Sequence, residues 1–171
     1  MATATNAHDG LQLLAADHRK VEDLFASFEK ASGASAKEKI VRQICTELKV
    51  HAQIEEEIYY PAIRGKVVED DLDEAYVEHD SAKLLINELE AADPDESFYD
   101  AKVKVLSELI DHHVEEEEKQ RDNLFQQTRA ADIDLEALGD RLAARKEELL
   151  AKAEAEGLPP AEAATLQHEE I

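Results

Sequence analysis

The chain has 171 residues, a formal net charge of −22, and charged side chains at 35% of its positions. It contains five glycines and four prolines, and Ala, Leu, Glu and Lys fill much of the rest, which favours helix almost everywhere. A surface this acidic repels phosphate backbones and anionic lipid headgroups. The sequence therefore predicts an all-α protein of one main domain, with neither nucleic acid nor a membrane as partner.

The cellular location is suggested by what the sequence lacks. No stretch approaches the roughly 20 apolar residues that span a bilayer. The N-terminal segment MATATNAHDG has neither a basic start nor an apolar run. The single cysteine, Cys45, cannot form an intrachain disulfide, which agrees with a reducing compartment. We therefore expect a cytoplasmic protein.

Breaker residues divide the chain into five expected helices. The first runs from about Asp9 to Lys30, and the second from the capping-box pattern Ser35-x-x-Glu38 to just before Gly65. The third runs from near Asp71 to Ala91-Ala92, and the fourth from Asp93-Pro94 to about Arg129. The fifth runs from about Asp134 to Glu156 and closes on Gly157.

Short connections between helices of this length favour antiparallel neighbours. The first four segments therefore predict an up-down-up-down four-helix bundle over residues 9–130. Residues 134–157 carry leucines on one stripe and are expected to pack outside the bundle as an accessory C-terminal helix. Residues 158–171, LPPAEAATLQHEEI, are expected to form a flexible tail in which His168 is solvated.

Helical periodicity, at about 100° per residue, places histidines at the centres of apolar stripes. There is one such histidine in each of the first four helices: His18, His51, His79 and His113. Glu55 and Glu117 lie on the same stripes, four residues after the second and the fourth histidine. His112 lies about 120° away from its stripe, so His113 is the preferred inward residue.

An ordinary explanation exists for each of these residues alone. One histidine on an apolar stripe is usually a buried imidazole with a routine hydrogen bond, and a run of glutamates is usually a solvated face. Buried carboxylates, however, are costly unless they pair with cations or coordinate a metal, and Lys83 is the one lysine or arginine on these stripes. The joint pattern favours a metal site over a metal-free bundle with neutral, buried Glu55 and Glu117.

The spacing also indicates which metal. Residues i and i+4 of a helix share one face, so His51 with Glu55 and His113 with Glu117 each present a nitrogen and an oxygen to one point. With the other two histidines, this makes four nitrogen and two oxygen donors. That set is too large for one tetrahedral zinc and contains no thiolate. It suits iron or manganese, and two carboxylates can bridge a pair of metals, so a dinuclear iron site, with manganese as the alternative, is the natural interpretation.

Four segments resemble the successive ligand motifs of the hemerythrin-like, or HHE cation-binding, family. They are LAADHRKV (14–21), HAQIEEEIYYP (51–61), EHDSAKLLI (78–86) and HVEEEE (113–118). The resemblance covers residues 10 to about 130, and DLEALGDRLAARK (134–146) is similar to the extra helix of many bacterial members. It implies a four-helix bundle around a non-haem diiron centre, with two iron ions joined by an oxo or hydroxo bridge.

The resemblance also implies a role for each site residue. His18 and His51 would bind one iron, His79 and His113 the other, and Glu55 and Glu117 would bridge the two. Glu116 and Glu118 remain alternatives to Glu117, which the stripe analysis favours.

Hemerythrin proper has a further histidine where this sequence has Lys83. One iron would therefore lack a protein ligand, and water, Tyr59 or Tyr60 could take that position, or it could stay open. Glu22, four residues after His18, is a further candidate.

These features predict a protein whose diiron centre binds or reacts with O2, NO or peroxide. One alternative is a peroxide-decomposing, catalase-like oxidoreductase, because a vacant coordination position can accept a reacting ligand. Another is an iron-responsive regulatory or buffering module, in which metal binding stabilises the bundle and the acidic surface or the fifth helix meets a protein partner.

Overall fold

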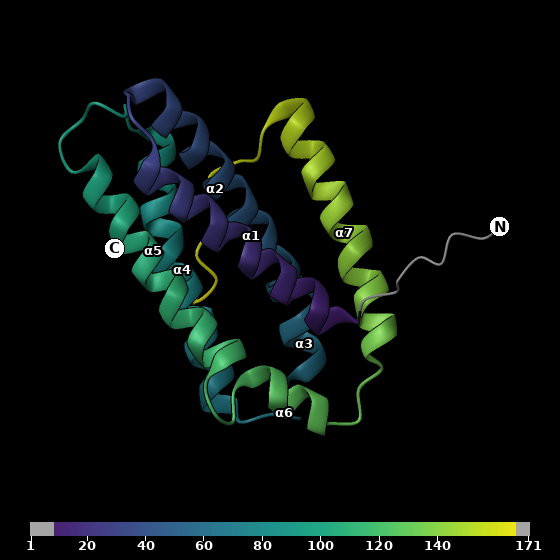
Figure 1. Ribbon diagram of the computed structural model, residues 1–171. Coiled ribbons are helices and arrows are strands. Elements are labelled where there is room, and N and C mark those ends of the chain that lie inside the picture. Colours follow the sequence, from purple (N-terminus) through teal and green to yellow (C-terminus); the bar gives the residue numbers. More distant parts are fainter. Residues whose placement is uncertain (1–8, 167–171) are drawn as a thin grey trace, which may run out of the picture.

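The computed structural model describes residues 9–166, which fold into helices joined by short connections (Figure 1). No strand occurs within this range. The elements are α1 (Gly10–Lys30), α2 (Ala34–Ile54), the π-helical turn η1 (Glu55–Tyr59), α3 (Tyr60–Ile63), α4 (Glu69–Ala91), α5 (Tyr99–Val114), the π-helical turn η2 (Glu115–Lys119), α6 (Leu124–Ala130) and α7 (Leu135–Glu156).

Helices α1, α2, α4 and α5 form a four-helix bundle in which successive helices run in opposite directions (Figure 1). Helix α1 packs on α2, α2 on α4, α4 on α5, and α5 again on α1, which closes the bundle. Helix α7 packs against α1 and α2 from outside. The all-α bundle with an additional C-terminal helix is confirmed. Among residues 9–166 no helix is long and apolar enough to cross a lipid bilayer.

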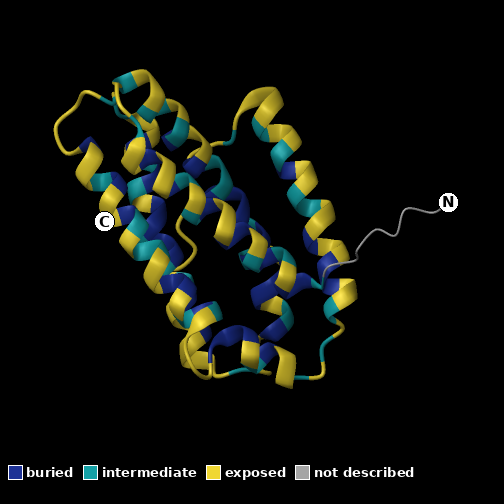
Figure 2. Ribbon diagram, viewed as in Figure 1, coloured by how far each residue is buried: buried dark blue, intermediate teal, exposed yellow. Residues whose placement is uncertain are grey.

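The apolar core is divided into two clusters with a polar layer between them. On α1, Leu14 belongs to one cluster and Val21 to the other, and His18 lies between them. His79 on α4 likewise lies between Ala75 and Ala82, and His51 on α2 lies between Leu48 and Ile54. On α5, His113 follows Leu106 of one cluster, and the next residue of the other cluster along the chain is Leu124 on α6. Figure 2 shows the buried residues along the inner faces of these helices. The fold therefore brings the four stripe histidines to one level of the bundle.

The helix starts follow the predicted signals in part. Asp9 caps α1 through a capping box with Gln12. The capping box predicted at Ser35 and Glu38 was wrong, because α2 already begins at residue 34 with Gly33 as its N-cap. Gly33 has φ 91°, a conformation that glycine adopts without strain, and its carbonyl accepts the first helical hydrogen bond. Helix α4 starts two residues before the expected position near residue 71.

The fourth expected helix, from Asp93-Pro94 to about residue 129, differs from the structure in two places: it begins later, and it is interrupted before α6. Residues 93–98 form turns, and α5 begins after Phe98, which has φ 70°. The interruption lies between η2 and α6, at Asn123. The Nδ2 of this residue donates to the carbonyls of Glu118 and Gln120, and its Oδ1 accepts from the amide of Gln126 in the first turn of α6. One buried side chain thus provides hydrogen bonds to backbone carbonyls where one helical segment ends and to a backbone amide where the next begins.

Residues 158–166 differ from the expected flexible tail, because they lie along α4 with specific hydrogen bonds. The side chain of Asn87 donates to the carbonyl of Ala161 at 2.9 Å and accepts from its amide at 2.8 Å. Asp80 accepts hydrogen bonds from the amides of Ala164 and Thr165 and from the Thr165 hydroxyl. His168 lies outside the described residues.

Candidate metal centre

Each helix of the bundle contributes one buried histidine to the polar layer. His18, His51, His79 and His113 are 4–7% exposed, and Glu55 and Glu117 are 0% and 2% exposed. We call these six residues the inner cluster. The side chain of His112, next to His113, is 63% exposed and does not belong to this cluster.

Both His-x-x-x-Glu motifs run into a π-helical turn. The amide of Tyr60 bonds the carbonyl of Glu55, and the amide of Gln120 bonds that of Glu115 at 2.8 Å, both five residues apart. In the first motif, Pro61 lacks an amide hydrogen and its ring crowds the preceding turn, which favours a departure from α-helical geometry. Single π-helical turns inside helices are frequent at functional sites.

Glu55 spans two histidines on different helices. Its Oε1 lies 3.1 Å from Nε2 of His51, and its Oε2 lies 3.0 Å from Nε2 of His79. Because one oxygen contacts His51 of α2 and the other contacts His79 of α4, this one carboxylate joins two helices of the bundle.

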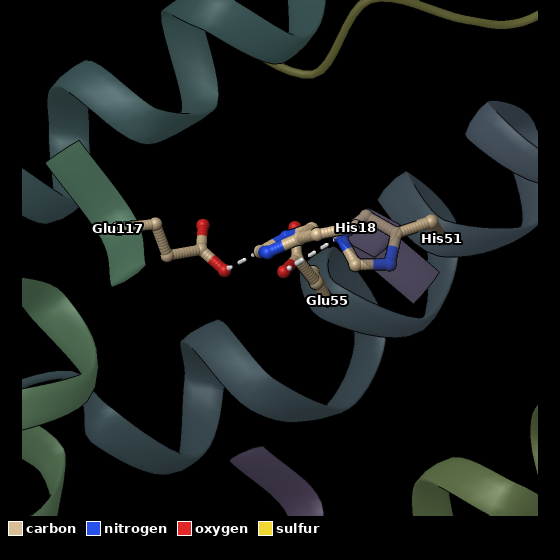
Figure 3. A group of neighbouring side chains, drawn as sticks. All are labelled: His18, His51, Glu55 and Glu117. Carbon is tan, nitrogen blue, oxygen red and sulfur yellow. Dashed lines mark hydrogen bonds and ion pairs between the residues drawn. The ribbon is translucent and has the colours of Figure 1, made fainter. Parts of the chain in front are cut away.

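Glu117 occupies the corresponding place for the other two histidines. Its Oε2 lies 2.8 Å from Nε2 of His113, and its Oε1 lies 3.9 Å from Nε2 of His18. The Nε2 atoms of His18 and His51 are 3.2 Å apart. Figure 3 shows Glu55 and Glu117 approaching these two imidazoles. All four histidines thus point Nε2 into the space between the two carboxylates.

The hydroxyl of Tyr60 lies inside the inner cluster. Its oxygen lies 3.0 Å from Glu55 Oε2, 2.9 Å from Glu117 Oε2 and 3.2 Å from Nε2 of His79, so its single proton is shared between the two carboxylates. Tyr59 does not reach the cluster, because its hydroxyl bonds Thr128.

The candidate ligand Glu22 also lies outside the cluster, as does Lys83, which stands where hemerythrin has a further histidine. Lys83 Nζ donates to Glu56 Oε1 at 2.8 Å and to the carbonyl of Glu162 at 2.9 Å. Glu22 pairs with Lys119 and Arg19 at the surface.

A second set of carboxylates surrounds the inner cluster and holds the Nδ1 atom of each histidine. Its members are Asp17 for His51 (3.1 Å), Glu56 for His79 (2.9 Å), Glu78 for His113 (2.9 Å) and Glu118 for His18 (3.0 Å). We call these four carboxylates the outer ring. Each one comes from the helix or π-helical turn that precedes its histidine around the bundle, so the ring links all four helices. Such bonds fix the tautomer and the orientation of an imidazole ligand.

Each carboxylate of the outer ring also has a cationic or imidazole partner. Lys83 binds Glu56, Arg19 Nη2 donates to Glu118 at 2.5 Å, and His112 Nε2 lies 3.3 Å from Glu78. Lys146 of α7 donates to Asp17 Oδ1.

The burial of so many ionisable groups shifts their pKa values in opposite directions. Burial lowers the pKa of His51, but the charges and hydrogen bonds of Glu55 and Asp17 outweigh it and raise the pKa to about 10. Burial raises the pKa of Glu55, but the adjacent histidines bring it well below its ordinary value. Burial and the charge of Glu55 raise the pKa of Glu117. Without metal, the inner cluster therefore balances its negative charge with protons on imidazole.

The inner cluster fits a cation. Glu55 Oε1, Glu117 Oε1 and His113 Nε2 are buried and make no hydrogen bond, because the close contacts of Glu55 Oε1 and His113 Nε2 described above lack hydrogen-bond geometry. Buried polar atoms without a partner are uncommon in proteins, and here three of them face one space. The donors fall into two groups that each could hold a metal ion: His18, His51, Glu55 and Glu117, and Glu55, His79 and His113.

A small cavity adjoins the inner cluster on one side. It has a volume of about 30 Å³, and all four histidines line it together with apolar side chains, among them Val21, Ala82 and Ile110. A water molecule needs about 10–15 Å³ of such volume, so the cavity has room for about two such molecules.

Comparison with known proteins agrees with this geometry. Residues 9–121 match the family model described as hemerythrin HHE cation binding domain. The chain belongs to the hemerythrin HHE cation binding domain family. The crystal structure of a hemerythrin HHE cation binding domain-containing protein from Mycobacterium kansasii has a similar fold, with a TM-score of 0.73 and 22% identity over 88% of this chain and 95% of that one.

One similar protein is much longer than this hemerythrin-like chain. A protein named DNA nickase, from Nostoc sp. (strain PCC 7120 / SAG 25.82 / UTEX 2576), is 31% identical over 102 residues. The match covers 60% of this chain and 29% of that protein, so this chain spans less than a third of its length.

The outer ring of this hemerythrin-like protein was not predicted from the sequence, although a local signal exists. Asp17 and Glu78 directly precede His18 and His79, and Glu56 and Glu118 directly follow Glu55 and Glu117. Each ring member is therefore the immediate neighbour of an inner-cluster residue. A run of glutamates is usually a solvated face, but here one glutamate beside each inward carboxylate binds a histidine of the next helix.

Proposed function

We propose that this protein holds two iron ions in the inner cluster, and that this centre binds or reacts with O2, NO or peroxide. The two donor groups that share Glu55 support a pair of metals, since one carboxylate can serve both. The donors are imidazole nitrogens and carboxylate oxygens, a set that suits iron. Bound iron would supply coordination positions and a change of oxidation state.

The size of the cavity beside the histidines supports the proposal that the ligand is a small molecule. Its volume of about 30 Å³ admits a molecule of two heavy atoms and excludes a larger organic substrate. Its apolar lining keeps bulk water from the imidazoles, which strengthens electrostatic interactions inside the site. The Tyr60 hydroxyl offers a hydrogen bond within the inner cluster.

Lys83 supports a centre that is open on one side. The lysine side chain is tied to Glu56 and to the carbonyl of Glu162, so α4 supplies the inner cluster with one donor, His79. The group that contains His79 has three protein donors, whereas the group that contains His18 has four. A small ligand would bind on the less occupied side.

The test is spectroscopic and uses the full chain. The metal-free protein is loaded with Fe(II) under argon, and absorption spectra are recorded before and after addition of O2, NO or H2O2. We expect near-ultraviolet and visible bands that change with the ligand. The variant His113→Ala should lose them, while Lys104→Ala, which changes an exposed residue of the same helix, should keep them. A wild-type protein without bands, or equal spectra from the two variants, would contradict the proposal.

A cavity-filling variant tests the small-ligand part separately. Ala82→Leu places extra volume against the cavity, at a cost of about 1–3 kcal/mol of stability. We expect unchanged iron content and at least about tenfold slower binding of NO, because the space beside the histidines is reduced. Unchanged binding rates would show that the ligand does not enter by this cavity. Turnover of H2O2, measured alongside, separates reaction from simple binding.

A further inference from the structure

Helix α7 lies outside the residues that match the family model, yet it reaches the outer ring. The family match ends at residue 121, and α7 begins at residue 135. Lys146 of this helix donates a hydrogen bond to Oδ1 of Asp17, whose Oδ2 accepts from Nδ1 of His51. A chain of two contacts thus connects the accessory helix to the inner cluster.

The other ring carboxylates obtain their partners in a different way. Arg19 is next to His18, Lys83 lies four residues after His79, and His112 precedes His113, so each partner belongs to the helix of the histidine that is held. On α2 the nearest lysine, Lys49, is committed to Glu90 and to the carbonyl of Leu158. Helix α2 therefore offers Asp17 no cation, and α7 provides it.

We propose that Lys146 is a positioning residue of the metal centre, which holds Asp17 in place so that His51 keeps its Nε2 atom directed into the inner cluster. Asp17 is 5% exposed, and a buried carboxylate with a single partner would be poorly satisfied. With Lys146 in place, both of its oxygens are engaged. Helix α7 then belongs to the site as well as to the fold. This inference rests on the proposed metal binding.

The neighbouring residue on α7 provides a matched control. Arg145 Nε donates to Glu57 Oε2 at 2.8 Å and also ties α7 to the bundle. Among the described residues, no hydrogen bond or ion pair joins Glu57 to a histidine. Loss of Arg145 therefore removes one tether of α7 and leaves the outer ring intact. Loss of Lys146 also removes one tether of α7, but in addition it takes the cationic partner from Asp17 of the outer ring.

The experiment compares Lys146→Met, Arg145→Met and Lys146→Arg as full-length chains. Affinity for Fe(II) is measured anaerobically by competition with a chelator, and the Nδ1–H proton of His51 is followed by NMR in the metal-free proteins. Loss of an outer partner of a metal ligand typically costs about 10–100-fold in affinity. Because Lys146 acts through Asp17, we expect about a tenfold loss in Lys146→Met, a shifted or broadened His51 signal, and recovery of both in Lys146→Arg.

The control decides between positioning and general support of the fold. Arg145→Met should keep the wild-type affinity and the wild-type His51 signal. Equal losses in Lys146→Met and Arg145→Met, or wild-type values in Lys146→Met, would overturn the inference. If the wild-type protein binds no Fe(II), the proposed function fails instead, and the His51 signal of the metal-free variants still tests the role of Lys146.

Discussion

Glu55 and Glu56 are neighbours in the sequence and hold the two nitrogens of one imidazole. Glu55 Oε2 lies 3.0 Å from Nε2 of His79, and Glu56 Oε2 lies 2.9 Å from Nδ1 of the same ring. Glu117 and Glu118 flank His18 in the same order, at 3.9 and 3.0 Å. An inner carboxylate followed by an outer one therefore fixes a histidine on the neighbouring helix in both halves of the site.

Replacement of Glu56 should weaken metal binding although the inner cluster stays complete. In Glu56→Gln the charge that holds Nδ1 of His79 is lost, and we expect about a 10–100-fold loss of Fe(II) affinity. Glu57→Gln is the matched control, because Glu57 contacts Arg145 and Gln53. Chelator competition measures both. Equal affinities for the two variants would contradict a role for Glu56 at the site.

Tyr60→Phe should destabilise the metal-free protein. The single proton of the Tyr60 hydroxyl lies between Glu55 and Glu117, and its loss leaves these two buried carboxylates without the donor that they share. We expect a decrease of about 1–3 kcal/mol in the free energy of unfolding, measured by urea denaturation. Tyr59→Phe should keep wild-type Fe(II) affinity, since its hydroxyl contacts Thr128 outside the cluster. A Tyr60→Phe protein as stable as wild type would argue against these hydrogen bonds.

The stability of the metal-free protein should fall as the pH rises. The pKa of His51 is raised from 6.5 to about 10 by Glu55 and Asp17 despite burial, and the pKa values of His79 and His113 are also raised. The stability contributed by protonated His51 is fully present below about pH 6.5 and is lost as the pH approaches about 10.

Thermal melting of the metal-free chain at pH 6.5 and 9.5 measures this effect. Bound metal takes the place of the protons, so the iron-loaded chain should show a smaller decline. A metal-free melting temperature that rises with pH would contradict the assigned direction.

Asp80 should anchor residues 158–166 to α4. Burial raises the pKa of its carboxyl, but the hydrogen bonds from Thr165 and Ala164 outweigh it, so the pKa lies below its ordinary 3.8. The anchor therefore contributes stability above about pH 3.8, which is lost as the pH falls through the lowered pKa. In Asp80→Ala, hydrogen exchange at the amides of Ala164 and Thr165 should accelerate. Asp70→Ala changes an exposed residue of the same helix and should leave the exchange rates of these two amides unchanged. Equal exchange rates in the two variants would contradict the role of Asp80 as an anchor.

The parts of the fold that depend on helical periodicity could be predicted from the sequence. Leu14, His18 and Val21 share one stripe of an amphipathic helix, and such a stripe must face the core wherever the helix lies. The same reasoning placed His113 inside and left His112 exposed, as the structure has them. The layer of six residues follows from four stripes of this kind. Metal ligation by these residues stays a prediction.

Features that depend on contacts between distant segments could not be predicted. Asn123 ends one helical segment and starts another because its side chain reaches two carbonyls of a turn that exists in the folded chain. Asp80 binds a segment about 85 residues away in the sequence. The pairing of Asp17 with Lys146 likewise depends on where α7 packs, and no periodicity within either helix encodes it.

Iron content per chain tests the central claim most directly. Full-length protein is loaded with Fe(II) under argon, freed of excess metal, and analysed for iron and protein, with an absorption spectrum taken before and after exposure to O2. The inner cluster, with its two donor groups that share Glu55, predicts two iron ions per chain and a spectrum that changes with O2. One iron or none per chain, or a spectrum that O2 leaves unchanged, would contradict it.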